Sequence, residues 1–275
     1  MFCGYSSPKP FTVRDYSRCF EYDIGVVEHW LSYLDKYSSG QASLAGKTVL
    51  DLGPGADLGV GVYLLSKGAG RYNAIDVNNL IKSVPQQFYG KFLARLSEIT
   101  LPTTLDSLRT QLDRLQAGES DRLNYVCRSD FDIVSAFGEK STDLVFSQAA
   151  FEHFDNVDHT VKQLSSVTRS GAIIIAEIDL KTHSRWIREK DPNSIYRYSE
   201  ILYNVLRFRG SPNRVRPYQY IDSFRRHGWH TIVVMPLTTL DGTQYCSIRE
   251  SLHPAFREEK NQMHYLTIMF CATKR

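Results

Sequence analysis

The sequence predicts an α/β fold, a doubly wound and mostly parallel sheet of seven strands with helices on both sides. Three observations support this. Short apolar segments alternate with helix-like segments over the first two thirds of the chain. The candidate strands are apolar at successive positions, which is typical of strands covered on both faces. Two late apolar segments, residues 229–237 and 265–274, suit a terminal antiparallel strand and its partner.

The overall composition is that of an ordinary globular chain. It has 275 residues, of which 42% are hydrophobic and 23% charged, with a formal net charge of +3. The longest purely apolar run, Ala172 to Ala176, is too short to cross a bilayer. The first residues lack the basic and apolar segments of a secretory signal. We therefore expect a cytoplasmic protein with no membrane partner, and its oligomeric state stays open.

The amino-terminal part alternates between helix and strand patterns. Residues 16–34 carry apolar side chains at helical spacing, and residues 47–53 predict a buried strand. Residues 60–69 predict a helix that ends at Gly68, and residues 72–77 predict a second strand that ends in an acid. Strand, helix and strand in this order form the unit of a parallel sheet.

A longer segment, residues 78–121, separates the second strand from the third. Its two halves, 87–99 and 103–118, both predict helices and are separated at Pro102. Residues 192–228 mix helical and loop signals. The remaining strands are predicted at residues 123–130, 142–148 and 172–180, before the terminal pair.

The stretch VLDLGPGADLGVG, residues 49–61, joins the first strand to a glycine-rich turn. A dinucleotide-binding turn has the pattern Gly-x-Gly-x-x-Gly; Gly53 and Gly55 fit it, but its third position is Leu58. Asp51 lies at the end of the strand, where its carboxylate would repel a pyrophosphate and attract a cation. The turn therefore favours a cationic ligand.

A second acid ends the second strand. Asp76 follows Asp51 by twenty-five residues, and an acid in this place can accept both hydroxyls of a ribose. The ligand would then carry a ribose, a positive group near the first strand and no phosphate. S-adenosylmethionine meets these three conditions, and its carboxylate could meet backbone donors at the start of the next helix.

Four motifs extend this argument. VLDLGPG, AIDV, RSDF and TDLVFSQAAFEHF occur in the order and spacing of class I S-adenosylmethionine-dependent methyltransferases, a Rossmann-like family, and the resemblance covers Lys47 to Leu180. FSQAAFEHF resembles the Ser-x-x-x-Leu-Glu-His element of the small-molecule branch, with Phe151 in place of Leu. Further along, IDLKTH and SPNRVRPYQYIDSFRRHGW resemble bacterial methyltransferases of surface-saccharide or secondary-metabolite pathways.

The resemblance implies a set of cofactor contacts at strand ends: Asp51, Gly53, Pro54, Gly55, Asp76, Asp130, Phe131, Ser147 and Gln148. The turn after the first strand would hold the methionine half, and the acid after the second strand would hold the ribose. The acid and aromatic after the third strand would meet the adenine, and the pair ending the fourth would lie beside the sulfonium methyl. A tight turn, a helix cap and a solvated loop are the structural alternatives.

The expected organisation is a single domain over residues 1–275. Its parts are an N-terminal helical cap (1–45), a cofactor-binding core (47–180) with a helical insertion (78–121), a substrate or lid segment (181–228) and the terminal strands (229–275). In sheets of this kind the ligand lies beyond the carboxyl ends of the strands.

Methyl transfer to a hydroxyl needs a base, because the attacking oxygen must lose its proton. Histidine suits this role, since its pKa is close to neutrality. His153 follows the fourth strand and His183 follows the fifth. We expect one of them to be the base and favour His153, which is closer in sequence to the predicted methyl position. Asp179, four residues before His183, could orient it or act itself, and a structural or surface histidine is the alternative.

No metal site is expected from the sequence. The stretch EHFDNVDH holds Glu152, Asp155, Asp158 and His159, whose spacing matches no standard ligand set. The cysteines are scattered, odd in number and without metal-ligand spacing, and we expect reduced thiols. They are Cys3, Cys19, Cys127, Cys246 and Cys271.

The segment from Lys181 to Gly228 holds eleven basic and four acidic residues, a local net charge of +7. Within it, Tyr196, Ser199 and Tyr203 lie at helical spacing with arginines nearby. Such a segment could cap the site and bind a small anionic or saccharide-like substrate. It could equally be a packing element with a solvated basic face.

The predicted function is methylation of a small molecule by S-adenosylmethionine, at a hydroxyl. Small-molecule N-methylation, nucleic-acid methylation through the basic segment and a non-catalytic binding protein of the same fold stay open as alternatives. Nucleic acid is not the expected partner, because no Asn/Asp-Pro-Pro-aromatic element follows the fourth strand and no Pro-Cys pair occurs. A nicotinamide-dependent oxidoreductase is disfavoured by Leu58.

Overall fold

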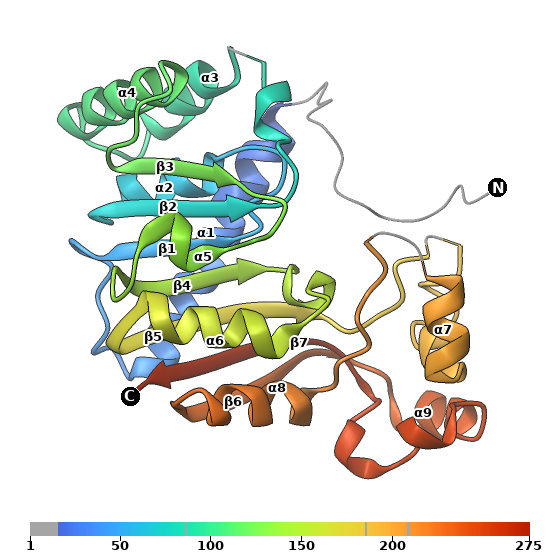
Figure 1. Ribbon diagram of the computed structural model, residues 1–275. Helices are drawn as coiled ribbons and strands as arrows, with labels where there is room; N and C mark the ends of the chain where they lie inside the picture. The colour runs from blue at the N-terminus through green and yellow to red at the C-terminus, as the bar shows by residue number, and fades with distance from the viewer. Residues whose placement is uncertain (1–15, 86, 185, 208–209) are drawn as a thin grey trace.

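The computed structural model describes residues 16–85, 87–184, 186–207 and 210–275, and within them one sheet of seven strands (Figure 1). The strand order is β3-β2-β1-β4-β5-β7-β6. Pairs from β3 to β5 are parallel, and β7 runs antiparallel to β5 and β6. The predicted doubly wound, mostly parallel sheet is confirmed. The strands are β1 (Thr48–Leu52), β2 (Arg71–Asp76), β3 (Leu123–Cys127), β4 (Thr142–Gln148), β5 (Thr168–Asp179), β6 (Trp229–Thr239) and β7 (Tyr265–Lys274).

The helices cover both faces of this sheet. Apolar side chains of α1 to α4 form one core cluster with the sheet, and those of α6 and α8 form a second cluster on the other face together with α5. Helix α7 lies beyond the carboxyl ends of the parallel strands (Figure 1). The helices are α1 (Tyr16–Ser38), α2 (Gly59–Ser66), α3 (Gln87–Leu96), α4 (Pro102–Gln116), α5 (Ile133–Phe137), α6 (Val157–Val167), α7 (Glu200–Leu206), α8 (Pro217–Arg226) and α9 (Gly242–Arg249).

Alternation along β1 decides which residues meet which helices. Val49 belongs to the core cluster under α1 and α2, whereas Leu50 and Leu52 belong to the cluster under α5 and α6. All four residues from Val49 to Leu52 are buried, which explains the near-continuous apolar pattern of this strand. Asp51 shares the face of Val49 and therefore points toward α2 and β2.

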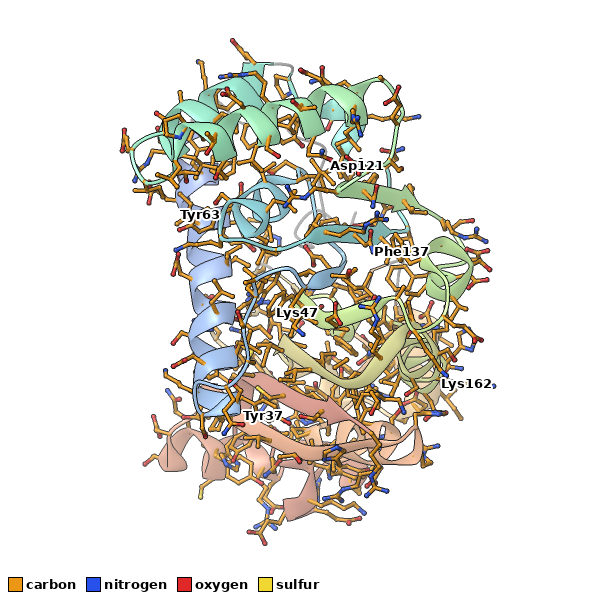
Figure 2. All side chains as sticks on the ribbon, turned by 90° about the vertical axis from the view of Figure 1, so that its left-hand side faces the viewer. Tyr37, Lys47, Tyr63, Asp121, Phe137 and Lys162 are labelled. Carbon is orange, nitrogen blue, oxygen red and sulfur yellow. The ribbon has the colours of Figure 1, made fainter. Side chains whose placement is uncertain are left out.

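Helix α1 runs across the strands along one face of the sheet, from α3 at one end to β6 and β7 at the other (Figure 2). The Trp30 ring stacks on Phe146 of β4 with centroids 4.9 Å apart. The Tyr37 hydroxyl donates to the Thr231 carbonyl at 2.8 Å and lies 2.8 Å from the Thr273 hydroxyl. Residues 1–15 of the expected N-terminal cap lie outside the described residues.

The insertion between β2 and β3 folds as the two predicted helices, α3 and α4. The apolar stripe of α3 is fully buried, since Phe88, Phe92 and Leu96 have no exposed surface. Helix α9, between β6 and β7, has no counterpart in the sequence prediction. None of its residues is buried, so it lacks the apolar stripe by which helices are recognised. Within the described ranges, no helix combines the length and apolar character needed to cross a membrane.

Candidate functional site

The turn between β1 and α2 has the backbone conformation that its glycines permit. Gly53 and Gly55, on either side of Pro54, have φ angles of +74° and +85°, a region that L-residues avoid. A Cβ atom on Gly53 would lie 3.0 Å from the Ala150 side chain, so the turn also packs closely against the segment after β4. The Gly53 N–H donates to the Ile75 carbonyl of β2 at 2.9 Å. The turn is thus held open beyond the ends of β1, β2 and β4.

The first of the predicted acids is a buried carboxyl. Asp51 is 1% exposed, and the Tyr72 hydroxyl of β2 donates to its Oδ2 at 2.6 Å. Burial raises the pKa of Asp51 to about 7; the Tyr72 hydrogen bond lowers the pKa, and the charge of Asp76 raises it. No cation among the described residues forms an ion pair with this carboxyl. A buried acid without a counter-ion suits a cationic ligand, which would stabilise its charged form.

Asp76 ends β2 and is 8% exposed. Burial raises the pKa of its carboxyl, while backbone N–H groups of Asn78, Val77 and Gly55 partly offset that effect. The Asn78 N–H donates to Oδ1 at 2.7 Å. This carboxyl is therefore held by main-chain N–H groups of the glycine turn and of the segment after β2.

Asp130 and Phe131 follow β3 and have different surroundings. Arg128 donates to both carboxylate oxygens of Asp130, at 2.9 and 2.7 Å, and holds the pKa of that carboxyl at about 2. The Asp130 side chain is 56% exposed. Phe131 has a φ of +50° and packs against Phe154, with ring centroids 5.1 Å apart. The sequence analysis did not foresee Arg128, which competes with any adenine amino group for Asp130.

Ser147 and Gln148, which end β4, differ in their contacts: the first is hydrogen-bonded within the sheet and the second has an unpartnered amide oxygen among the described residues. Ser147 is fully buried, and its hydroxyl donates to the Leu52 carbonyl at 3.3 Å. Gln148 carries a buried Oε1 with no hydrogen-bond partner among the described residues. Its neighbour Ala149 has a φ of +51°. The unpartnered amide oxygen leaves an acceptor at the carboxyl end of β4, next to the glycine turn.

A second buried carboxyl cluster, absent from the sequence analysis, joins α1 to the glycine turn. Asp23 of α1 is 4% exposed, and one of its carboxylate oxygens lacks a hydrogen-bond partner. Burial and the neighbouring Asp57 raise its pKa well above the usual range. Asp57 accepts from the Gly59 N–H at 2.8 Å, at the start of α2. Asp23 is one polar residue on the otherwise apolar buried face of α1. A single polar residue hardly changes the apolar periodicity of a helix, so the sequence alone gave no signal for its burial.

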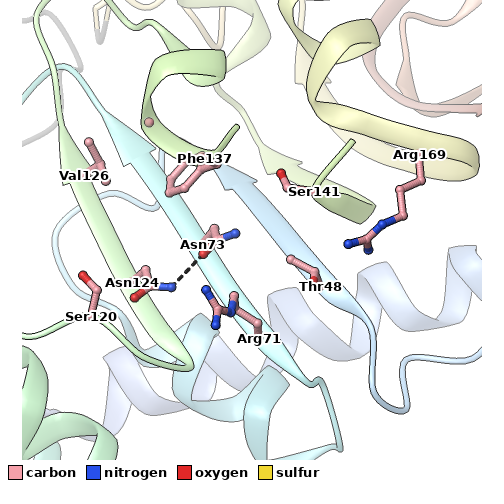
Figure 3. Close-up of a pocket in the computed structure, with 10 residues that line it drawn as sticks. Thr48, Arg71, Asn73, Ser120, Asn124, Val126, Phe137, Ser141 and Arg169 are labelled. Atoms are coloured by element: carbon pink, nitrogen blue, oxygen red, sulfur yellow. Dashed lines mark hydrogen bonds between the residues drawn. The ribbon is translucent and has the colours of Figure 1, made fainter. Parts of the chain in front are cut away.

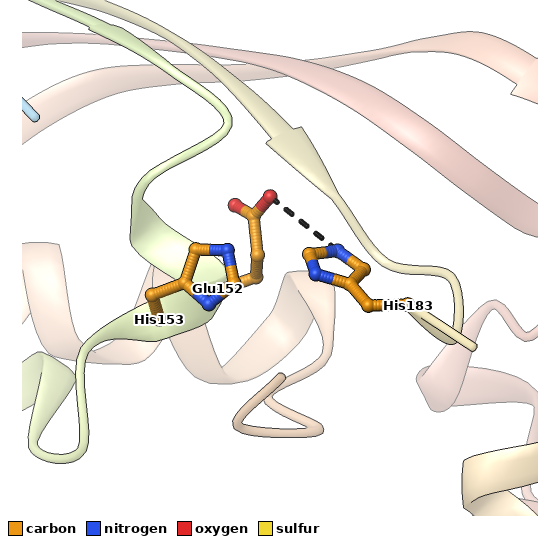
Figure 4. Close-up of side chains that lie close together, drawn as sticks. All are labelled: Glu152, His153 and His183. Carbon is orange, nitrogen blue, oxygen red and sulfur yellow. Dashed lines mark ion pairs between the residues drawn. The ribbon is translucent and has the colours of Figure 1, made fainter. Parts of the chain in front are cut away.

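Both candidate histidines meet at the carboxyl ends of β4 and β5, beside Glu152 (Figure 4). The rings of His153 and His183 have centroids 4.9 Å apart. The His183 Nε2 lies 3.6 Å from Asp179 Oδ2 and 3.9 Å from Glu152 Oε1. Asp179 is in turn paired with Arg188. The cluster thus combines two imidazoles with two carboxylates from neighbouring strand ends.

The electrostatics of these groups differ. Burial, together with the neighbouring His183, lowers the pKa of His153 to about 4. Burial raises the pKa of Glu152 well above its usual range, and the charge of Asp179 adds to this rise. Burial alone would raise the pKa of Asp179, but His183, Lys181 and Arg188 outweigh it, and the pKa lies below the usual value. His183 is therefore the imidazole that lies beside an ionised carboxylate.

The other acids of the EHFDNVDH stretch point elsewhere. Asp155 pairs with Arg207 at 3.3 Å, and Asp158 pairs with Arg226 at 3.1 Å. His159 is exposed on α6. Only Glu152 and His153 of this stretch reach the cluster, and His183 arrives from β5.

The aromatic residues of the expected lid are packing elements. Tyr196 is 1% exposed, and its hydroxyl donates to the Leu180 carbonyl at 2.7 Å. Ser199 caps α7 by accepting from the Leu202 N–H. The Tyr203 hydroxyl donates to the Pro212 carbonyl, and the Arg214 guanidinium lies over its ring. These contacts agree with the second interpretation of the segment, in which its side chains pack within the protein and stabilise the segment itself.

Many basic side chains of residues 181–228 are engaged within the protein. Arg216 is fully buried and donates to the carbonyls of Asn261, Gln262 and Tyr265. Arg185 and Arg209 lie outside the described residues. Ion pairs with carboxylates are formed by Arg188, Arg197, Arg207, Arg214 and Arg226. The net charge of this segment therefore overstates the positive surface that it presents.

A pocket of about 500 Å³ lies at the amino ends of the strands, on the side away from the glycine turn (Figure 3). Arg71 and Arg169 line it, and the Asn124 amide donates to Asn73 at 2.9 Å within it. Thr48 and Arg71 begin β1 and β2, so this pocket is separate from the candidate site.

The cysteines of the described part form no disulfide; they are Cys19, Cys127, Cys246 and Cys271. Cys3 lies outside the described residues.

Comparison with known proteins gives one family match. Residues 89–176 match a family model described as a methyltransferase domain. This range includes β3, β4 and most of β5, together with Glu152 and His153; the end of β5 and His183 lie beyond it. Among proteins with curated descriptions, none matches the chain in sequence.

Solved structures share the fold. A phosphoethanolamine N-methyltransferase of Haemonchus contortus, in complex with S-adenosyl-L-methionine, has a TM-score of 0.50 at 14% identity, covering 98% of this chain and 62% of that one. The same enzyme with phosphomonomethylethanolamine and S-adenosylhomocysteine has a TM-score of 0.50 at 15% identity, covering 98% and 61%. An S-adenosylmethionine-dependent methyltransferase of Mesorhizobium loti has a TM-score of 0.46 at 14% identity, covering 87% and 96%.

The family match and the fold agree. Together they support an S-adenosylmethionine-dependent methyltransferase of the class I fold, with S-adenosylmethionine as its cofactor. The acids and glycines at the ends of β1 and β2 fit this cofactor, because they offer a buried carboxyl without an ion-pair partner among the described residues, a half-buried backbone turn and a second acid.

Proposed function

We propose that the protein transfers the methyl group of S-adenosylmethionine to a hydroxyl of a small molecule in the cytoplasm, such as a saccharide or a secondary metabolite. The observation that carries this proposal is the meeting of His153, His183 and Glu152 at the ends of β4 and β5. These ends adjoin the turn and the acids that fit the cofactor. A substrate hydroxyl needs a proton acceptor beside the cofactor's methyl group, and an imidazole at the ends of β4 and β5 can accept that proton.

The cofactor contacts follow from the strand ends. Asp51 and the turn of Gly53, Pro54 and Gly55 would hold the cationic methionine half, and Asp76 would accept from the ribose hydroxyls. The adenine would lie between Phe131 and the Asp130 carboxylate, which would exchange part of its contact with Arg128. Ser147 and Gln148 would lie beside the methyl group. When bound, the cofactor supplies an electrophilic methyl carbon with a neutral thioether as leaving group.

Within the histidine cluster, we assign the proton acceptor to His183. The Asp179 carboxylate lies 3.6 Å from its ring and would stabilise the charged imidazolium. His153 has a pKa of about 4, which makes it a weak acceptor at neutral pH. The preference for His153 in the sequence analysis rested on its distance along the chain, before the neighbours of either ring were known.

N-methylation of a small amine is the second candidate. The structure of the Haemonchus contortus enzyme contains a phosphorylated amine, which makes amines a reasonable class to test. An amine with a free lone pair needs no base before it attacks, so the histidine cluster favours the hydroxyl. A non-catalytic binding protein is less favoured, because it would need no proton acceptor beside the cofactor.

The test is a methylation assay on the full chain. S-adenosylmethionine is incubated with a panel of nucleotide sugars, phenols and matched amines, and products are analysed by mass spectrometry. We expect a methyl group on oxygen in at least one member. If only amines are methylated, the acceptor is an amine and the proposed hydroxyl acceptor is wrong. Binding of S-adenosylhomocysteine with no product from any class would favour the binding protein.

A substitution at Asp76 tests the proposed cofactor site separately from methyl transfer. Removing the Asp76 carboxylate should cost up to about 1.5–3 kcal/mol for each hydrogen bond lost to the ribose. Calorimetry with S-adenosylhomocysteine on Asp76→Ala measures this loss, and Asp113→Ala, an exposed acid of α4, is the control. Equal affinity in wild type and Asp76→Ala would remove Asp76 from the cofactor site.

A further inference from the structure

We infer that Glu152, His153 and His183 form a binding site for one divalent transition-metal ion, with an open position toward the substrate. Each residue offers one ligand atom, and these three atoms lie within 4.8 Å of one another (Figure 4). The ion binding is independent of the acceptor proposed above. Its consequence for proton removal rests on the proposed function.

The Glu152 side chain gives the strongest support. It is 2% exposed, and neither of its carboxylate oxygens has a hydrogen bond of good geometry with the described residues, although the backbone N–H groups of Glu152 and Asp179 act to lower its pKa. A buried carboxylate is costly unless it is paired, hydrogen-bonded or bound to a metal. Among the described residues, the basic side chain that pairs with it is His183, whose Nε2 lies 3.9 Å from Oε1. An ion between the three side chains would satisfy this carboxylate.

The histidines supply the remaining ligands. The Nδ1 atom of His153 is buried and has no hydrogen-bond partner among the described residues. His183 is 6% exposed, so water competes little for its ring. Ligand atoms around a tetrahedral zinc ion are about 3.3 Å apart, given bonds of roughly 2.0–2.2 Å. Small side-chain rotations bring atoms that are less than 4.8 Å apart to this spacing.

The surroundings also resemble those of a metal centre. Metal-bound histidines are commonly oriented by a neighbouring carboxylate. Asp179 Oδ2 lies 3.6 Å from His183 Nε2 and is held in place by Arg188, so it can orient the ring through Nε2 while Nδ1 binds the ion. The sequence analysis expected no metal, since it considered only the stretch of residues 152–159 and the cysteines. His183 comes from β5, and only the fold brings it to the other two ligands.

The ligand set selects the class of ion. Two imidazoles and one carboxylate suit zinc and its neighbours, whereas magnesium and calcium prefer an all-oxygen shell. Three protein ligands leave a fourth position open, as in catalytic rather than structural zinc sites. With the ion bound, neither imidazole has a lone pair free to take a proton, so the role of proton acceptor that we assign to His183 applies to the metal-free protein. A substrate hydroxyl in the open position would be acidified by the ion, and its proton would leave to water.

The first experiment is calorimetric titration of the chelator-treated full chain with Zn²⁺. We expect one tight site, and a much weaker response to Mg²⁺ at the same concentration. In Glu152→Gln, which keeps the size of the side chain, and in His183→Ala, affinity should fall on the order of 100-fold. The matched control is His159→Ala, an exposed histidine of the same stretch, in which affinity should not change.

Two measurements keep this test decisive. Circular dichroism and thermal melts in chelator show whether each variant is folded, and His153→Gln replaces any variant that is not. The absorption spectrum with Co²⁺ distinguishes nitrogen and oxygen ligands from cysteine sulfur, since Cys127 and Cys246 are exposed. Absence of a tight Zn²⁺ site, unchanged affinity in folded variants of the three residues, or a cysteine-type Co²⁺ spectrum would each overturn the inference.

Neither cofactor nor substrate is present in these titrations. A negative result therefore leaves the proposed methyl transfer intact. Conversely, Zn²⁺ binding by this cluster together with a failed methylation assay would support the metal site while contradicting the proposed function.

Discussion

The Tyr72 hydroxyl of β2 donates a 2.6 Å hydrogen bond to the Asp51 carboxyl of β1, and both side chains are almost completely buried. The bond holds the acid that we assign to the methionine half of the cofactor. It also fixes the orientation of Asp51, because no other described side chain donates to this carboxyl.

Loss of the tyrosine hydroxyl should weaken cofactor binding. In Tyr72→Phe, the Asp51 carboxylate loses a hydrogen bond to a charged group, worth about 1.5–3 kcal/mol, and its pKa should rise further. We expect roughly a tenfold or greater loss of affinity for S-adenosylmethionine at pH 7, measured by calorimetry. Tyr63→Phe is the control, since that hydroxyl bonds to Glu28 away from the site. Equal losses in both variants would point to packing instead.

The raised pKa of Asp51 predicts the pH dependence of stability in the cofactor-free protein. The folded state keeps this proton up to about pH 7, while the unfolded state releases it near pH 4. The folded state therefore binds more protons between these values, and the free energy of unfolding falls as pH rises through that window. Asp51→Asn should remove this fall and be more stable at pH 8, by on the order of 1–4 kcal/mol.

Chemical denaturation at pH 5 and pH 8 measures this effect. Asp113→Asn, at an exposed position of α4, should retain the wild-type dependence. If Asp51→Asn shows the same slope as wild type, the carboxyl is already ionised in the folded state. The same variant should bind the cofactor more weakly, because a neutral amide cannot pair with a cation.

The two histidines should differ in their effect on turnover. With the enzyme in chelator and a hydroxyl acceptor from the panel, His183→Ala should lower kcat by about 10²–10⁴-fold, the usual range for a general base. His153→Ala should have a smaller effect, since its pKa of about 4 makes it a poor proton acceptor. Affinity for S-adenosylhomocysteine should change little in either. A larger loss in His153→Ala would return the role to His153.

The basic segment should not bind nucleic acid tightly. Several of its arginines are paired with carboxylates, and Arg216 is buried among backbone carbonyls. Mobility shifts with RNA and duplex DNA at physiological salt should show at most the weak binding of non-specific contacts, with Kd of about 10⁻⁴–10⁻⁶ M. Sub-micromolar binding that weakens steeply with salt would favour a nucleic-acid substrate.

Arg216 should be a major determinant of stability. Its guanidinium donates to three carbonyls of residues 261–265 and to the Tyr196 hydroxyl. Arg216→Ala removes these donors and leaves a cavity, so the free energy of unfolding should fall by about 3–5 kcal/mol. Arg225→Ala, on the exposed face of the same helix, should change it by less than about 0.5 kcal/mol. Similar losses in both variants would contradict this role.

The sequence predicts the sheet well because burial on both faces leaves a plain apolar signal. The limits predicted for β4 and for β7 agree with the structure. The start of β5 was placed at residue 172, whereas the strand begins at Thr168. Thr168 pairs with Thr142 across an irregularity in the register, and neither residue is apolar. Hydrophobic patterning cannot detect such a pair.

The sequence predicts which residues lie at the carboxyl ends of the strands, but not which of their side chains contact one another. The carboxyl ends of parallel strands must meet at one edge, so Asp51, Asp76 and His153 could be grouped in advance. Which side chains touch depends on register and on the direction of each side chain. The Tyr72 partner of Asp51, the Arg128 partner of Asp130 and the contact between Glu152 and His183 all depend on that geometry.

The position of α1 has a consequence for synthesis of the chain. Its apolar face, with Val27, Trp30 and Leu34, belongs to the same core cluster as Met269 and Cys271 of β7. On the ribosome, α1 emerges long before β7 does, so part of its binding surface does not yet exist. The nascent chain must carry this helix with an incompletely covered face until β7 inserts between β5 and β6. Chaperone contact or aggregation during translation is therefore expected to concentrate on α1.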